Sequence, residues 1–214
     1  LAAFQLRYIS EAYLTGTMPE TPIVVFMALT ALVSAGIARR GIRLIAMMAE
    51  LIAFLVLISL LLTIVLPLDV VQLRNLLPVF PEGLRPLMLP TATAVPLFLD
   101  MVVLMMIAPS MTSGVGLMQG TVWSALVSGA VLTLLIVVVT AVFGPISTAL
   151  ELPALSLTRM ISIGGVVERL ELITVVSWTF GIGLALATVF WAAATASAHL
   201  LGLRCFEPLV YPLG

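Results

Sequence analysis

The chain has 214 residues, of which 62% are hydrophobic and 9% are charged, and its mean hydropathy is +1.28. Soluble domains carry about 25% charged residues, so this composition excludes a soluble globular domain. The net charge of −1 excludes a nucleic-acid binder that relies on a basic face, and the single cysteine, Cys205, excludes a disulfide scaffold. The sequence therefore predicts an integral membrane protein.

Apolar runs divide the chain into helical spans, each of which needs about 20 residues to cross a bilayer. Residues 1–14 are too few for a crossing and are predicted to be the tail of a truncated span. Thr21-Pro22 suits an N-cap followed by proline at the first helical position. Five full spans are expected over about residues 21–38, 42–68, 84–109, 117–143 and 166–201. The predicted class is an all-α polytopic membrane protein, with residues 1–214 forming a single transmembrane domain.

Arginine placement predicts the orientation. Arg39, Arg40 and Arg43 fall within five residues, between the first two full spans, and Arg204 lies on the same side after four more crossings. Cytoplasmic loops carry an excess of arginine and lysine. The Arg39–Arg43 loop is therefore predicted to be cytoplasmic, with residues 69–85 and 144–165 facing outward.

A proline-rich segment precedes an acid within the span over residues 84–109. Residues 90–96 contain two prolines and two threonines, and Asp100 follows among apolar neighbours. Prolines leave helical carbonyls unpaired, and unwound backbone at membrane depth is tolerated where it lines a cavity. This pattern predicts a discontinuous helix with a ligand site. The alternative is a kinked helix whose Asp100 is protonated or bonded to a neighbour.

Other polar residues within apolar runs are weaker candidates. Glu50 is either a functional acid or a carboxyl reached by water or paired with arginine, because ionisable groups are costly inside a bilayer. Tyr8 could donate a hydrogen bond from the first helix. Trp178 could form the wall of a cavity or simply pack, with Thr174 and Ser177 close by. Small residues such as Gly181 and Ala185 predict close helix packing.

The sequence contains no recognisable catalytic or cofactor pattern. His199 has no second metal ligand near it in the sequence, and no nucleophile–base pair is evident. We therefore expect no enzyme activity, no cofactor and no metal.

Several stretches, taken in order, resemble the B-subunit, permease-like proteins of spore germinant receptors. They are residues 18–22, 73–79, 157–164, 167–171 and 207–214. The resemblance implies the ten-helix, inverted-repeat fold of the amino acid–polyamine–organocation transporter superfamily. The chain would then cover the end of the third helix through the eighth, with the start of the ninth.

The resemblance also implies function. A small nutrient, typically an L-amino acid, would bind near mid-membrane beside A-type and C-type receptor subunits, in the inner membrane of the spore. The ligand-binding residues implied are Tyr8, Thr91, Thr93, Ala94, Asp100, Thr174, Ser177 and Trp178.

Three interpretations remain open from the sequence. The chain belongs to a nutrient-sensing receptor subunit, to a permease that couples amino-acid uptake to protons through Asp100 or Glu50, or to a purely structural membrane subunit. The sequence alone does not separate them.

Overall fold

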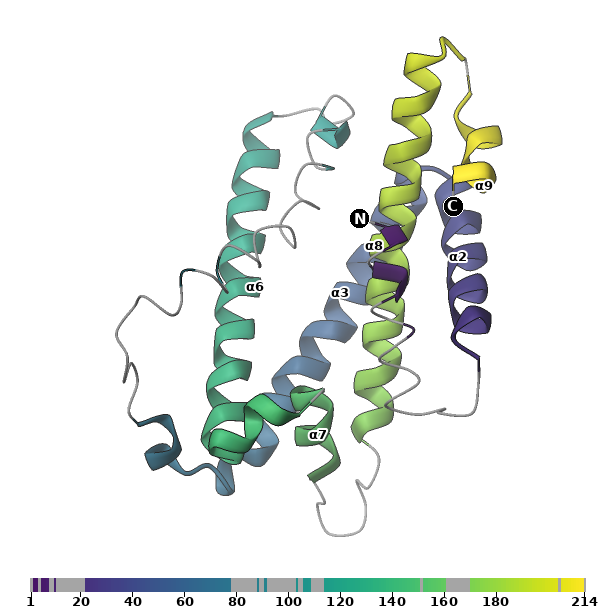
Figure 1. Ribbon diagram of the computed structural model, residues 1–214. Helices are drawn as coiled ribbons and strands as arrows, with labels where there is room; N and C mark the ends of the chain where they lie inside the picture. The colour runs from purple at the N-terminus through teal and green to yellow at the C-terminus, as the bar shows by residue number, and fades with distance from the viewer. Residues whose placement is uncertain are drawn as a thin grey trace. The chain divides into compact units, whose positions relative to one another are not determined.

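The computed structural model describes residues 2–3, 5–7, 10, 22–77, 88, 91, 103, 106–108, 114–150, 152–160, 170–203 and 205–213. Every regular element within these residues is a helix, which confirms the all-α class (Figure 1). Three helical stretches in the described part are long and apolar enough to cross a membrane, and a shorter apolar helix covers Ile23–Arg39. The three are Ile42–Asp69, Met118–Ala149 and Leu172–Leu200.

The three long stretches match three of the five predicted full spans, and the helix over Ile23–Arg39 lies where a fourth was predicted but has only 17 residues. Most of the fifth, over residues 84–109, lies outside the described residues, as does much of the partial span at residues 1–14. The ten-helix inverted repeat therefore stays a prediction.

The first long helix, α2 (Ile23–Arg39), begins one residue later than the sequence indicates. Pro22 occupies the N-cap, because its ψ of 132° is extended rather than helical. Its carbonyl accepts a hydrogen bond from the Val25 N–H at 3.0 Å. At the other end Gly41 has a φ of +85°, a conformation that favours glycine and lets the chain turn at once into α3 (Ile42–Val65).

Contacts divide the chain into two units, residues 1–57 with 175–214 (unit 1) and residues 58–174 (unit 2). Unit 1 contains α2, the first part of α3 and most of α8 (Leu170–Leu200). It also contains η7 (Glu207–Leu209) and α9 (Val210–Leu213), and α9 packs against α2 (Figure 1). A Cβ atom at Gly181 would lie 3.6 Å from Cγ2 of Val56, so a small residue on α8 does allow a close approach to α3.

Unit 2 is built around α6 (Gly114–Phe143), which begins three residues before the predicted start at Leu117. It also contains the last part of α3 and the first turn of α8. Four shorter elements all contact α6: η1 (Leu66–Asp69), η2 (Leu73–Leu76), η6 (Gly144–Ala149) and α7 (Pro153–Met160). The helix ends at Phe143, as predicted, and the tighter turns of η6 follow directly from Gly144.

Two hydrogen bonds hold η2 against the end of α6. Asn75 Nδ2 donates to the Ala141 carbonyl at 2.9 Å, and the Gln72 N–H donates to the same oxygen at 3.1 Å. Gly144, with a φ of +57°, turns the chain beneath the Asn75 side chain. The Ala141 carbonyl thus holds η2 in place. It is free to do so because the last four carbonyl groups of a helix lack partners within that helix.

The segment over residues 144–165 was expected to be an outward loop, but part of it forms α7. Its buried residues are Ala154, Leu155, Leu157 and Thr158. These positions follow the helical spacing of one face, so burying that face against unit 2 stabilises a helix of only eight residues.

The long helices leave many large apolar side chains exposed. On α3, Leu51 and Phe54 are 75% and 66% exposed, and on α6, Ile136 is 64% exposed. Patches of this kind are costly in water and suit contact with lipid. The exposure agrees with the membrane class indicated by composition.

Candidate functional site

A cluster of buried hydroxyl groups joins α3 to α8 within unit 2. Ser59, Thr63 and Thr174 are each 2% exposed. Ser59 Oγ donates to Thr174 Oγ1 at 3.3 Å, and Thr63 Oγ1 donates to the Ser59 carbonyl at 2.9 Å. Thr174, which the sequence singled out, therefore lies at a helix–helix contact. Its partner Ser59 was not predicted, because serine in an apolar run gives no signal of which face it occupies.

Ser177 lies three residues beyond Thr174 on α8, in unit 1. Its side chain is 0% exposed, whereas Trp178 is partly exposed. A buried hydroxyl in an apolar helix is costly unless it is hydrogen-bonded. Of the three predicted ligand-binding residues on α8, Thr174 and Ser177 are therefore buried and Trp178 is not.

The remaining predicted ligand-binding residues belong mostly to parts that the structure does not describe. Tyr8, Thr93, Ala94 and Asp100 lie outside the described residues. Thr91 is helical and exposed. Their grouping around a broken helix stays a prediction.

Glu50 is exposed on α3, within a candidate membrane span. No residue in the described ranges forms an ion pair with it. A charged side chain at the bilayer centre costs roughly 2.5–3.5 kcal/mol on insertion scales. The position of Glu50 is therefore compatible with contact to water or to a group outside the described residues.

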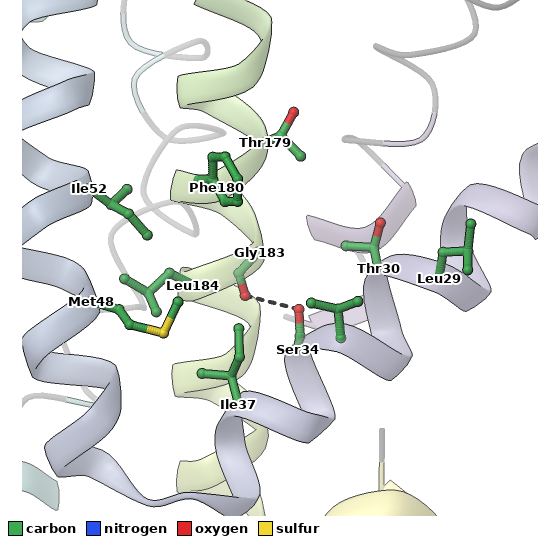
Figure 2. A pocket seen from close by; sticks show the side chains of 11 residues that line it. Leu29, Thr30, Ser34, Ile37, Met48, Ile52, Thr179, Phe180, Gly183 and Leu184 are labelled. Carbon is green, nitrogen blue, oxygen red and sulfur yellow. Dashed lines mark hydrogen bonds between the residues drawn. The ribbon is translucent and has the colours of Figure 1, made fainter.

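Unit 1 contains a pocket of about 280 Å³ between α2, α3 and α8 (Figure 2). Figure 2 shows Met48 and Ile52 of α3 directed toward α8, and the Ser34 hydroxyl of α2 directed to the backbone of α8. Ser34 Oγ donates to the Gly183 carbonyl at 2.9 Å. The lining residues are Leu29, Thr30, Val33, Ser34, Ile37, Met48, Ile52, Thr179, Phe180, Gly183 and Leu184.

The sequence did not indicate this pocket. Its residues come from three helices that are apolar on all sides, so periodicity does not show which faces meet. Ser34 is 1% exposed, but a serine in a membrane helix bonds either to its own or to a neighbouring helix, so the sequence did not show that it contacts α8.

The described residues contain no group of three or more histidine, cysteine, aspartate or glutamate side chains placed to hold a metal ion. His199 and Cys205 are both exposed. The polar residues that are buried in the described part are serines and threonines, whose hydroxyls can donate and accept hydrogen bonds.

Comparison with known proteins identifies the class. The family model described as "Spore germination protein", the spore permease family, matches residues 1–214, so the chain belongs to this family of membrane proteins. A curated relative is Spore germination protein KB of Bacillus subtilis (strain 168), which is 25% identical over 219 residues. The match covers 100% of this chain and 59% of the relative, so the chain spans less than two thirds of that protein's length. No solved structure matches the chain.

Proposed function

We propose that this chain is the membrane-embedded part of a germinant-receptor subunit that senses a nutrient. An L-amino acid binds near the middle of the bilayer, and the subunit triggers germination together with A-type and C-type subunits in the inner membrane of the spore. The Arg39–Arg43 loop faces the cytoplasm. Family membership over the whole chain supports this proposal, as does the name of the relative.

The observation that carries the proposal is the burial of Ser177, at 0% exposed, and Thr174, at 2% exposed, on a helix that is otherwise strongly apolar. Buried hydroxyls can orient the ammonium and carboxylate groups of an amino acid. In the proposed site Trp178 adds an apolar wall beside them. Tyr8, Thr91, Thr93 and Ala94 complete the site from the third and sixth helices of the family, and Asp100 lies below the break.

A proton-coupled permease is the second candidate, and Glu50 favours it. An exposed acid within a candidate span is the kind of group that takes up and releases protons during transport. In this alternative Glu50 or Asp100 couples amino-acid uptake to proton movement.

Equilibrium binding of a labelled L-amino acid panel to the complete protein in nanodiscs tests the proposal. Saturable binding that Asp100→Asn weakens is expected. Absence of saturable binding across the panel, with the protein shown to be folded, would contradict amino-acid sensing by this subunit.

Measuring amino-acid uptake distinguishes the nutrient sensor from the permease. In proteoliposomes carrying a pH gradient, a sensor accumulates no amino acid beyond its binding capacity, whereas a permease accumulates it and Glu50→Gln or Asp100→Asn abolishes the accumulation. Sustained uptake would therefore replace the sensing proposal with the permease.

A further inference from the structure

Two features of unit 1 lie on the same face of α2. Leu29, Val33 and Ile37 line the pocket at intervals of four residues, so they form one stripe along the helix. Arg40 follows Leu29 by eleven residues, which is close to three full turns of about 3.6 residues each. Its φ of −74° and ψ of −7° continue the helical backbone, so Arg40 extends the pocket stripe to the end of α2.

Arg40 is available to an external anion. It is exposed, and among the described residues no acid pairs with it; the acids described in unit 1 are Glu50 and Glu207. The neighbouring Arg39 already has a partner, because its guanidinium lies 5.0 Å from the centre of the Tyr211 ring. The first turn of α3 begins two residues after Arg40, and its amide groups add partial positive charge there.

The pocket beneath Arg40 is open to the surroundings of the helices. Leu29, Val33 and Phe180 on its rim are 57%, 62% and 53% exposed. In a membrane these side chains face hydrocarbon, so the pocket opens into the bilayer rather than into water.

The polar groups of the pocket are largely occupied. Ser34 Oγ donates to the Gly183 carbonyl at 2.9 Å, and Thr179 Oγ1 donates to the Val175 carbonyl at 2.6 Å. The remaining wall is aliphatic and aromatic, apart from Thr30. Such a surface accepts a hydrocarbon chain without leaving polar groups unpaired.

We propose that unit 1 binds one anionic phospholipid, with its phosphate at Arg40 and one acyl chain in the pocket between α2, α3 and α8. Arginine binds phosphate through two parallel hydrogen bonds, and basic residues beside a membrane helix attract anionic lipid. The lining residues of α2 extend over about 12 Å along the helix, at ~1.5 Å per residue, which is the length of several methylene groups. An acidic protein segment would satisfy Arg40 but would not fill an apolar pocket open to the bilayer.

Native mass spectrometry of the complete protein tests this site, with phosphatidylglycerol and phosphatidylcholine supplied in equal amounts. The unsubstituted protein is expected to retain phosphatidylglycerol in preference. Arg40→Gln should lower this retention about fivefold, the factor expected for one surface arginine. Phosphatidylcholine retention should fall less, because its choline group already neutralises the charge of the phosphate. Arg74→Gln, an exposed arginine on η2 of unit 2, is the matched control and should change neither lipid.

A second substitution tests the acyl chain. Gly183→Leu is designed to fill the pocket, and a Cβ atom at this position would approach nothing closer than Ser34 Oγ at 3.9 Å. It should reduce retention of phosphatidylglycerol; if it impairs folding, Leu29→Trp at the exposed rim serves instead. Equal retention of both lipids by the unsubstituted protein would overturn the proposal. So would an equal loss in Arg74→Gln, or full displacement of the lipid by soluble glycerol phosphate.

Discussion

The hydroxyl of Ser59 on α3 donates a hydrogen bond to Thr174 Oγ1 on α8 at 3.3 Å, and both side chains are 2% exposed. This contact joins two membrane-spanning helices through polar atoms inside unit 2. It places Thr174, a predicted ligand-binding residue, in a position where it also holds two helices together. Binding and packing must therefore be measured separately at this residue.

Substituting both hydroxyls should show that they are coupled. In a double-mutant cycle with Ser59→Ala and Thr174→Val, we expect a coupling free energy of about 0.6 kcal/mol, the average for hydrogen bonds between membrane helices. Reversible unfolding in mixed micelles provides the measurement. Ser128→Ala with Thr133→Val on α6 is the control, because each of these exposed hydroxyls donates to its own helix at 2.7 Å. An equal coupling free energy in the two pairs would contradict a direct hydrogen bond between Ser59 and Thr174.

Gly144→Ala should destabilise the protein by about 1–2 kcal/mol, because a residue with a Cβ atom resists the left-handed conformation. The φ of Gly144 is +57°, and an added Cβ would lie 3.3 Å from Cγ of Asn75. Gly120→Ala is the matched control, since Gly120 lies inside α6 with nothing within 4 Å of the added atom. The control should be neutral or stabilising by up to about 1 kcal/mol. Equal effects on the free energy of unfolding would show that the turn does not constrain Gly144.

Asn75→Ala should release η2 from the end of α6. The substitution removes the 2.9 Å bond from Nδ2 to the Ala141 carbonyl and costs about 1 kcal/mol. Hydrogen exchange at residues 73–77 should accelerate, while exchange in α2 should not change. Unchanged protection of η2 would mean that the Gln72 N–H bond to the same carbonyl is sufficient.

Replacing Tyr211 should loosen α9 from the end of α2, because Arg39 lies over the tyrosine ring. Tyr211→Leu is expected to cost about 0.5–1 kcal/mol, the usual value for an exposed cation–π contact. Tyr211→Phe keeps the ring and should cost less. Faster hydrogen exchange over residues 207–213 in the leucine variant alone is the expected result, and identical exchange in both variants would contradict the role of the ring.

The sequence predicted the helices well and the contacts between them poorly. Long apolar runs located α3, α6 and α8 to within a few residues at most described ends, because crossing a bilayer fixes both the composition and the length of a span. Contacts such as Asn75 with Ala141 and Ser34 with Gly183 join residues 66 and 149 positions apart. Helices that are apolar on every side do not reveal which face packs inward, so neither contact was predictable.

The candidate site was predicted only in part. Thr174 and Ser177 were named from the sequence and are buried. Ser59 and the pocket lined by Ser34 were missed, because a lone serine gives no indication of its neighbours on other helices. All the ligand-binding assignments stay predictions, and those at Tyr8, Thr93, Ala94 and Asp100 lie outside the described residues.

The most direct test of nutrient sensing compares Ser177→Ala with Ser128→Ala in the complete protein in nanodiscs, with the dissociation constant for the best L-amino acid as readout. Ser177 is 0% exposed on α8, whereas the Ser128 hydroxyl is exposed and bonded to Ser124 O at 2.7 Å. We expect Ser177→Ala to weaken binding about fivefold, or about 1 kcal/mol, with Ser128→Ala unchanged and both proteins folded. Equal affinity in the two variants would contradict a ligand site at this face of α8.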